Sequence, residues 1–348
     1  MTRLADGAIA RLREAATWPA LPPDRYEIRR PLGRGGMGTV YAAYDRRLER
    51  EVAIKVSNAA APSSDLEARL RQEARVLAHL EHPGIVPVHD AGLLDDGRWF
   101  YVMKYVRGET LPQHVASLVG EAAVLGVFER IAEAVAFAHA AGVVHRDLKP
   151  SNVMVGAFGE VLVLDWGVAK VLAMPTTPES SPDPETTPDS SPDREKTPES
   201  SAATAAGTRI GTPGFMAPEQ ARGDASTAGP SADVYSLGAL LYWLLTATPA
   251  PASADAITRG LAGLQPRPSR RLRAIVARCL ADAPAGRYAD AGALAEDLQR
   301  YRAGVAVHAH RESVFERAGR FASRYRTFIL LVAAYLIMRA VFAWLQRR

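Results

Sequence analysis

The stretch that decides the fold is Val144-His-Arg-Asp-Leu-Lys-Pro-Ser-Asn152, followed at residue 165 by Asp165-Trp-Gly167. Two short apolar runs, Val153-Met-Val155 and Val161–Leu164, lie between these motifs and are typical of a pair of short strands. The chain differs in pattern on the two sides of this hairpin.

Before the hairpin, short strand-like runs are bounded by glycine or charged turns, and after Gly108 the pattern is mostly helical. The expected strands are Tyr26–Ile28, Thr39–Ala43, Glu51–Val56 and Trp99–Met103, with one helix in 66–80 among them and longer helices at 122–140 and 232–245. A sheet-rich part followed by a helix-rich part predicts an α+β fold with two lobes.

A glycine-rich stretch, Leu32-Gly-Arg-Gly-Gly-Met-Gly-Thr-Val-Tyr41, precedes a strand-like run. Glycines let a backbone approach phosphate oxygens, although glycine-rich turns also occur for purely structural reasons. Because a strand follows instead of a helix, the pattern favours a hairpin lid over a nucleotide's phosphates rather than a dinucleotide fold.

Lys55 lies among apolar neighbours in Val52-Ala-Ile-Lys55. A buried ammonium group needs anionic partners such as phosphates and a carboxylate, and Glu73 on the following helix is the natural carboxylate. The alternative is a lysine at a strand end whose charged group is solvated.

The full set of motifs resembles the protein kinase family. The glycine-rich loop, strand Lys, helix Glu, catalytic loop, Asp-Trp-Gly triplet and Ala217-Pro-Glu219 follow the family's order and spacing over about Tyr26–Tyr301. Within the family, the chain looks most like bacterial membrane-tethered Ser/Thr kinases. The resemblance implies a bilobal kinase-like fold with a small β-rich N-lobe and a larger helical C-lobe.

The resemblance also implies a catalytic set. Asp147 would accept the proton of the substrate hydroxyl, and Lys149 would neutralise charge on the phosphoryl group in transfer. Lys55, held by Glu73, would steady the α- and β-phosphates, and Thr212 would support Asp147 and Lys149.

The implied cofactors are ATP and Mg²⁺, with Asn152 and Asp165 as oxygen ligands of the metal. The hinge would be Lys104–Val106, with Lys104 where relatives often have Glu. The residues expected to contact the nucleotide are Leu32, Gly33, Arg34, Gly35, Gly36, Met37, Gly38, Val40, Ala53, Lys55, Met103 and Met154.

Other matching positions are expected to be structural. Asp233 resembles the helix residue that anchors the catalytic-loop backbone, and Glu219 with Arg287 resembles a buried ion pair in the C-lobe. Trp166 departs from the family, which usually has Phe there, while the neighbouring Asp165 and Gly167 are intact.

Residues 173–206 form an insertion that carries seven acids against two bases and contains a Ser/Thr-Pro repeat. Its composition predicts disorder, either as an inert solvated insertion or as a phosphorylation-rich segment. In the family this region is the regulatory activation loop, and Arg146 would pair with a phosphate on it. Autophosphorylation in 204–212, with Thr204 and Thr208 as the best-placed acceptors, is expected to raise activity.

The expected organisation is an N-terminal extension (1–25), a kinase domain (26–302), a basic juxtamembrane linker (303–327) and a transmembrane helix (328–345). The N-lobe would cover about 26–106 and the C-lobe about 107–302. The last segment is apolar except for Arg339, and arginines before it outnumber those after it. This predicts a single-pass protein of the bacterial inner membrane with a cytoplasmic kinase domain. The alternatives are an amphipathic helix that lies on the membrane surface and a helix that docks on the protein.

The charge distribution limits the expected partners. The formal net charge is +4, but residues 311–348 carry eight Arg against two Glu, so the folded middle is near neutral and a nucleic-acid binder is excluded. The single Cys279 excludes an internal disulfide. Protein substrates, the membrane and a possible homodimer remain as partners. The alternatives are a pseudokinase scaffold or a small-molecule kinase, the latter weakened by the peptide-kinase segment Gly211–Glu219.

Overall fold

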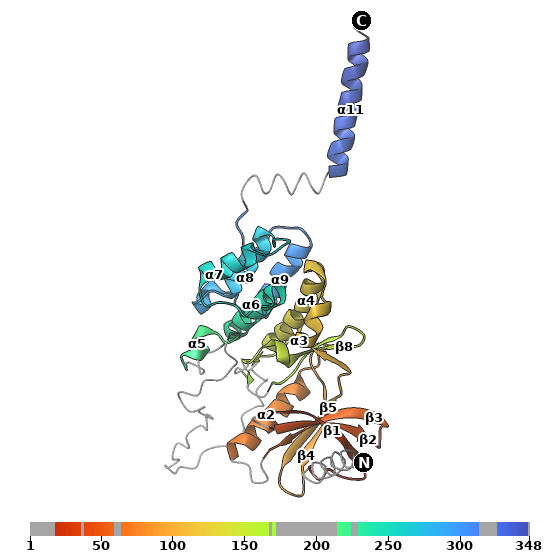
Figure 1. Cartoon of the computed structure of the whole chain (residues 1–348), viewed down its shortest axis with the longest axis vertical. Helices are drawn as coiled ribbons and strands as arrows, with labels where there is room; N and C mark the ends of the chain where they lie inside the picture. Colours follow the sequence, from red (N-terminus) through yellow and green to blue (C-terminus); the bar gives the residue numbers. More distant parts are fainter. Residues whose placement is uncertain are drawn as a thin grey trace, which may run out of the picture.

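The computed structural model describes residues 18–35, 38–58, 64–166, 169–171, 214–223, 229–312 and 326–346, a few of them by their backbone alone. Figure 1 shows a smaller strand-rich lobe below a larger helical lobe, which confirms the predicted bilobal α+β architecture.

The N-lobe is a five-stranded antiparallel sheet in the order β1-β2-β3-β5-β4, with the helix α2 (Ser64–His79) beside it. Its strands are β1 (Tyr26–Arg34), β2 (Gly38–Asp45), β3 (Arg50–Ser57), β4 (Val88–Leu93) and β5 (Trp99–Lys104). Strand β3 is central and pairs Lys55 with Val40 on one side and with Tyr101 on the other. This register puts Lys55 in the middle of the sheet.

The outer face of this sheet is covered by residues that precede β1. Leu21 is buried among Tyr26, Tyr41 and Val56, and the Trp18 ring meets the Tyr41 ring edge-on at 6.4 Å. The Arg25 guanidinium forms an ion pair with Asp90 at 2.6 Å. Residues 18–25, expected to belong to an extension, therefore pack as part of the N-lobe.

We expect Leu21→Ala to lower the free energy of unfolding by about 2 kcal/mol, the low end for a buried leucine, because the site borders solvent and can partly collapse. Chemical denaturation followed by circular dichroism would measure it. Leu48→Ala is the matched control, since Leu48 is 60% exposed. Equal losses in the two variants would contradict a structural role for this segment.

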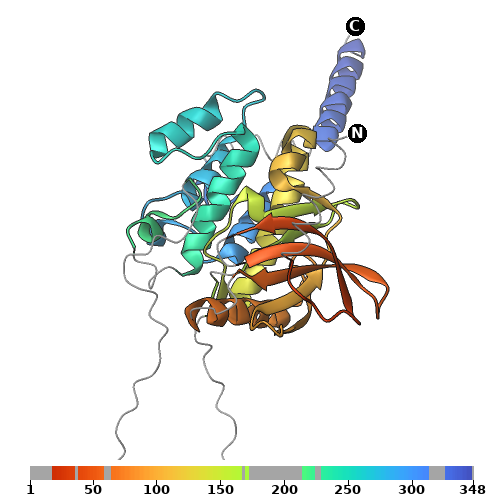
Figure 2. The same ribbon diagram turned by 60° about the horizontal axis from the view of Figure 1, so that its bottom comes forward.

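The C-lobe is built on four longer helices, α4, α6, α8 and α9, which pack against one another (Figures 1 and 2). Its α-helices are α3 (Leu111–His114), α4 (Gly120–Ala140), α5 (Pro218–Ala221), α6 (Pro230–Thr246), α7 (Ala254–Ala262), α8 (Arg270–Cys279) and α9 (Ala291–Arg302). Gly238 of α6 allows a close approach to α8, since a Cβ there would lie 2.4 Å from the Cβ of Cys279. Cys279 is fully buried, as a small apolar side chain would be.

Two small sheets lie where the lobes meet. β6 (Gly108–Thr110), β8 (Val153–Gly156) and β9 (Val161–Val163) form an antiparallel sheet, and β7 (Val143–Val144) pairs with β10 (Lys170–Val171). The predicted hairpin between the two motifs is thus β8 and β9, preceded by the one-turn helix η2 (Pro150–Asn152). It holds Asn152 and Asp165 at adjacent ends of paired strands.

The segment that follows α9 folds back onto the C-lobe. Val307 is buried, and the buried Asp297 carboxylate accepts the backbone N–H groups of His308 and Ala309 at 2.5 and 2.9 Å. The first part of the expected linker, 303–310, is therefore an ordered edge of the C-lobe. The His308 ring faces solvent near Glu296, and no cluster of potential metal ligands occurs among the described residues.

The expected apolar C-terminal segment forms the helix α11 (Arg326–Leu345), which contains Arg339. Its described apolar side chains are exposed, among them Leu331, Ile337 and Phe342. In the part of the chain that the structure describes, no helix combines the length and the apolarity that crossing a bilayer needs. The expectation of a transmembrane helix at 328–345 is therefore not confirmed.

Candidate active site

A buried lysine connects three elements at the centre of the site. The Lys55 ammonium on β3 donates to both carboxylate oxygens of Glu73 on α2, each at 2.8 Å, and to Oδ1 of Asp165 at 3.1 Å. Glu73 is fully buried, whereas the Asp165 side chain is 45% exposed to solvent. The solvated strand-end alternative for Lys55 is therefore wrong.

This charge network fixes the protonation of its members. Burial lowers the pKa of Lys55, but the negative charges of Glu73 and Asp165 outweigh it and raise the pKa above its usual value. Burial likewise raises the pKa of Asp165, but the charge and hydrogen bond of Lys55 lower it overall. Lys55 stays cationic and Asp165 anionic at neutral pH.

Tyr101 completes the network and was not predicted from the sequence. It lies opposite Lys55 on β5, is almost fully buried, and its hydroxyl hydrogen-bonds the Glu73 carboxylate. The Lys55 ammonium lies 5.9 Å from the Tyr101 ring centroid. The useful sequence signal was a tyrosine inside a strand-like run, because a buried hydroxyl needs a partner.

The catalytic loop brings Asp147, Lys149 and Asn152 together. The Lys149 ammonium donates to Oδ2 of Asp147 at 2.6 Å, and Nδ2 of Asn152 donates to the Asp147 carbonyl at 2.9 Å. The Leu164 N–H donates to the Asn152 carbonyl at 2.8 Å, which places Asp165 next to this loop. Asp147, Lys149, Asn152 and Asp165, which we expected in the catalytic and metal-binding sets, therefore lie close together.

His145 ties the catalytic loop to the triplet. Its Nδ1 accepts the Asp147 N–H at 3.3 Å, so Nε2 carries the proton and donates to the Leu164 carbonyl at 3.0 Å. The His145 and Trp166 rings pack with their centroids 4.6 Å apart. Trp166 is buried and its indole N–H points to the Val163 carbonyl at 3.4 Å, so the larger ring is accommodated without displacing Asp165.

Asp233 at the start of α6 anchors the same loop, as predicted. Its carboxylate accepts the backbone N–H groups of His145 at 2.7 Å and Arg146 at 2.8 Å, and Nε2–H of His139 at 2.9 Å. Burial raises the pKa of Asp233, but these hydrogen bonds and nearby histidines lower it overall. Arg146 adopts φ +70°, a strained conformation that this anchor holds.

The site fits a divalent cation at Asn152 and Asp165. Because Nδ2 of Asn152 is turned to the Asp147 carbonyl, its Oδ1 faces away, and no group in the described residues donates to that oxygen. An amide oxygen beside an ionised, partly exposed carboxylate is a donor set that Mg²⁺ accepts.

The glycine-rich hairpin is held by Asn58, just after β3, which the sequence analysis did not identify. Nδ2 of Asn58 donates to the Gly35 carbonyl at 2.8 Å, and its Oδ1 accepts the Thr39 hydroxyl at 2.9 Å. A Cβ on Gly38 would lie 2.5 Å from the Val56 carbonyl oxygen, so glycine is required there for packing. The turn is thus fixed to β3 at two points.

We expect Asn58→Ala to raise the KM for ATP by roughly threefold to tenfold, with a smaller effect on kcat. The reason is that the two hydrogen bonds of Asn58, each contributing about 0.5–1 kcal/mol, position the glycine-rich loop. Steady-state kinetics would measure this. Asn58→Asp keeps the acceptor for Thr39 but cannot donate to Gly35, so it should fall in between. An unchanged KM in both variants would contradict this role.

The residues expected around the adenine come from two sheets. Ala53 and Met103 lie on the five-stranded sheet of the N-lobe, and Met154 lies on strand β8 of the small sheet. Ala53 pairs with Met103 across β3 and β5, while the half-buried Met103 and Met154 pack against the same apolar cluster. The Lys104 N–H donates to the Pro87 carbonyl at 3.1 Å. The hinge contacts expected of Lys104–Val106 with the nucleotide stay a prediction.

The protein kinase domain model matches residues 26–289. The chain belongs to the protein kinase family. It is 36% identical over 236 residues to the serine/threonine-protein kinase PknD of Chlamydia caviae, which covers 64% of this chain and 24% of the relative. Over 249 residues it is also 36% identical to PknD of Protochlamydia amoebophila, covering 67% of this chain and 24% of that protein.

Solved structures agree with this family. The kinase domain of PknI from Mycobacterium tuberculosis superposes with a TM-score of 0.56 at 25% identity, covering 81% of this chain and 99% of that one. The chain spans about a quarter of the length of the curated PknD relatives. The predicted family and bilobal fold are confirmed.

The kinase C-lobe contains the predicted ion pair between Glu219 and Arg287. Nη1 and Nη2 of Arg287 donate to the two Glu219 oxygens at 2.7 and 2.9 Å. The same guanidinium donates to the carbonyls of Ala281, Ser231 and Asp282. Both side chains are buried, so the pair fixes the segment after the activation loop to the start of α6 and to the connection between α8 and α9.

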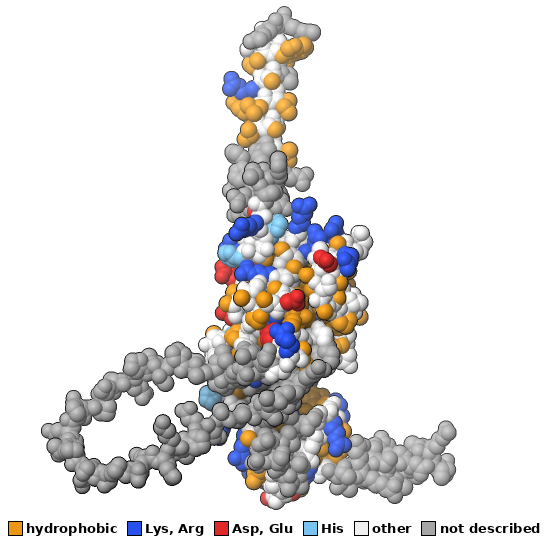
Figure 3. All heavy atoms as spheres, turned by 90° about the vertical axis from the view of Figure 1, so that its left-hand side faces the viewer, with side chains coloured by type: hydrophobic (Ala, Val, Ile, Leu, Met, Phe, Trp, Pro, Cys, Tyr) orange, Lys and Arg blue, Asp and Glu red, His pale blue; other side chains and the backbone are white. Residues whose placement is uncertain are grey.

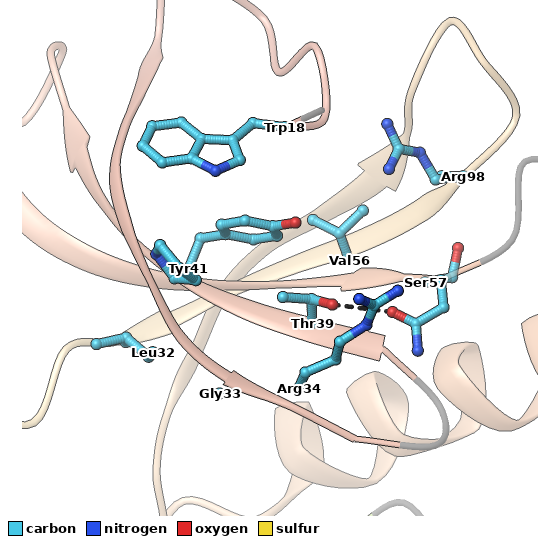
Figure 4. A pocket seen from close by; sticks show the side chains of 11 residues that line it. Trp18, Leu32, Gly33, Arg34, Thr39, Tyr41, Val56, Ser57 and Arg98 are labelled. Atoms are coloured by element: carbon cyan, nitrogen blue, oxygen red, sulfur yellow. Dashed lines mark hydrogen bonds between the residues drawn. The ribbon is translucent and has the colours of Figure 1, made fainter. Parts of the chain in front are cut away.

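A cavity of about 720 Å³ lies on the outer face of the kinase N-lobe (Figure 4), and neither Lys55 nor Asp147 lines it. Figure 4 shows Trp18 above Tyr41 and Val56, whose side chains belong to the outer apolar cluster. The side chain of Lys55 points to the opposite face of the sheet, because successive residues of a strand alternate between the two faces. Leu32, Gly33 and Arg34 border this cavity. These three residues, which we expect to contact the nucleotide, therefore also line a cavity on the outer side of the glycine-rich hairpin.

Several expected site residues lie outside the described residues. Thr212 of the catalytic set and Gly36 and Met37 of the glycine-rich loop are among them. Thr204 and Thr208 also fall in that part of the chain, together with the whole insertion 173–206.

Proposed function

We propose that this chain is a serine/threonine protein kinase that transfers the γ-phosphate of ATP to protein hydroxyl groups. The observation that carries the proposal is the joint placement of Lys55, Glu73 and Asp165 beside Asp147 and Lys149. The PknD relatives are named as serine/threonine kinases, which supports the choice of acceptor.

Asp147 and Lys149 act on the reacting atoms. The Asp147 carboxylate orients the substrate hydroxyl and accepts its proton while the new O–P bond forms and the bond to the β-phosphate oxygen breaks. Lys149, at 2.6 Å from that carboxylate, neutralises charge on the transferring phosphoryl group. Asp233 holds the loop backbone so that neither side chain has to reorganise.

Lys55 positions the α- and β-phosphates, since Glu73 and Tyr101 fix it inside the sheet. Asn152 and Asp165 would hold Mg²⁺, which when bound neutralises phosphate charge. The hairpin clamped by Asn58 covers the phosphates and excludes water.

The pseudokinase alternative has little support. A scaffold without phosphoryl transfer commonly lacks one of the charged groups, yet Lys55, Glu73 and Asp165 are all in contact here. Trp166, the departure that favoured this alternative, is buried without disturbing that contact. Transfer of labelled γ-phosphate to a generic protein substrate, with phosphoamino-acid analysis, tests the proposal: label on Ser or Thr supports it, and nucleotide binding without transfer favours the scaffold.

We further propose that autophosphorylation in 204–212 raises activity. Arg146 precedes Asp147 and donates its backbone N–H to Asp233, so a phosphate held by the Arg146 side chain would reinforce the catalytic loop. The test measures the kinase activity of two double variants. One combines Thr204→Ala with Thr208→Ala, and the control combines Thr186→Ala with Thr187→Ala in the repeat. Activity must fall only in the first pair, and equal rates in both would disprove this regulation.

We also propose that α11 attaches the protein to a lipid bilayer, with the kinase domain on the cytoplasmic side where ATP is available. Its described apolar side chains are exposed, including Leu330, Leu336 and Phe342. The arginines in 311–326 precede it and favour anionic headgroups. Flotation of the full chain with phosphatidylcholine vesicles tests this, and failure to float would contradict it.

A further inference from the structure

One face of the C-lobe carries a cluster of arginines around the start of α8. Residues 256–281 contain six Arg and no Asp, Glu or Lys. Figure 3 shows basic side chains gathered over the upper end of the C-lobe. We call Arg267, Arg270 and Arg273 the α8 arginine cluster.

The cluster lies where positive charge is unfavourable. Ser269 caps α8 by accepting the Leu272 N–H at 3.2 Å, and the first turn of the helix has no acidic residue. Helix N-termini carry partial positive charge, so arginines there are repelled. The pKa of Arg273 is lowered by burial and then by the charges of Arg267 and Arg270.

Two neighbouring arginines have structural roles, unlike Arg273. Arg271 donates to the Val305 carbonyl at 3.0 Å and lies over the Tyr301 ring, and Arg278 lies over the Tyr288 ring. In contrast, Nε of Arg273 is buried and has no hydrogen-bond partner among the described residues. An anion beside the cluster would offset the repulsion between these arginines.

The polypeptide leaves the kinase domain close to the same helix. The contact between Arg271 and Val305 places the ordered segment 303–310 beside α8. Five more arginines follow in 311–326 against two Glu, and then the exposed apolar helix α11. A bilayer bound through α11 would be tethered to the end of the C-lobe that bears the cluster.

We propose that the α8 arginine cluster binds the headgroups of an anionic lipid bilayer and so fixes the orientation of the kinase domain on the membrane. This inference rests on the proposed attachment through α11. A bilayer presents many phosphates in one plane, which suits several guanidinium groups on one face. The cluster faces the lipid, and the catalytic cleft between the lobes stays open to soluble proteins.

The test is flotation of the full chain with phosphatidylcholine vesicles, with and without added phosphatidylglycerol. Arg267→Gln with Arg273→Gln should lower the partition onto phosphatidylglycerol vesicles about 30-fold, at roughly fivefold per arginine. Binding to phosphatidylcholine alone should not change. Arg29→Gln with Arg46→Gln, two exposed N-lobe arginines paired with Glu27, is the control of equal charge and should match the wild type.

Further arms separate the two proposals. Leu331→Ser with Leu336→Ser and Ile337→Ser should abolish binding to phosphatidylcholine, and if it does not, attachment through α11 is wrong. Wild-type partition by the Arg267 and Arg273 variant on phosphatidylglycerol vesicles would overturn the role of the cluster. It would also be overturned if a phosphorylated peptide of 177–196 bound the cluster while anionic vesicles did not.

Discussion

Replacing Asp147 by Asn is expected to lower the rate of phosphoryl transfer by roughly 10²- to 10⁴-fold, the range that a positioned general base contributes. The amide keeps the size of the side chain and can still accept the Lys149 ammonium, but it cannot take the proton of the substrate hydroxyl. Binding of ATP and thermal stability should hardly change, because Lys55, Glu73 and Asp165 are untouched.

Single-turnover transfer of labelled γ-phosphate would measure this loss, and fluorescence titration with an ATP analogue would check binding. Asp95→Asn, on an exposed turn between β4 and β5, is the matched control. If Asp147→Asn retained the wild-type rate, Asp147 would not be the base. If it lost nucleotide binding as well, its role would be structural.

Arg287→Ala is expected to lower the free energy of unfolding by about 3–5 kcal/mol, because it leaves the Glu219 carboxylate buried without its partner. For a domain of this size the melting temperature should fall by on the order of 10 °C. The double variant Glu219→Leu with Arg287→Met removes both charges and should lose less than Arg287→Ala alone.

The pH dependence of this loss is a second check. Burial raises the pKa of Glu219, but the hydrogen bonds and charge of Arg287 hold it below the ordinary value. The stabilisation is therefore fully present above about pH 4.3, the ordinary value for Glu, and is lost as the pH falls through the lower folded-state pKa. Thermal melts in acid should show a smaller difference between wild type and Arg287→Ala, and a constant difference would contradict this pair's role.

The sequence predicted the contacts that the family's motifs encode. The apolar surroundings of Lys55 pointed to Glu73 on the following helix as its partner, and the resemblance to the family identified Asp233 as the anchor and Arg287 as the partner of Glu219. Tyr101 and Asn58 were missed because their roles depend on strand register and on a hairpin folding back, which no local pattern reports.

The domain edges were harder to predict for a different reason. Trp18 and Leu21 lie in a proline-rich stretch without periodicity, and residues 303–310 pack through the buried Val307 side chain and two backbone contacts to Asp297. Such segments are ordered by the tertiary contacts that they make, which no local sequence pattern predicts. The prediction of a helix from the apolar C-terminal segment is confirmed, whereas the prediction that this helix crosses a membrane is not confirmed.

The glycines of the hairpin differ in what would preserve them over evolutionary time. Gly38 is required by the neighbouring strand itself, since any side chain would collide with the Val56 carbonyl, whereas a Cβ on Gly33 meets nothing within 4 Å. A duplicated copy of this gene that lost its chemistry should therefore keep Gly38 and drift at Gly33. In a comparison of such copies, substitution at Gly33 would mark the loss of nucleotide handling, and substitution at Gly38 would mark the loss of the fold.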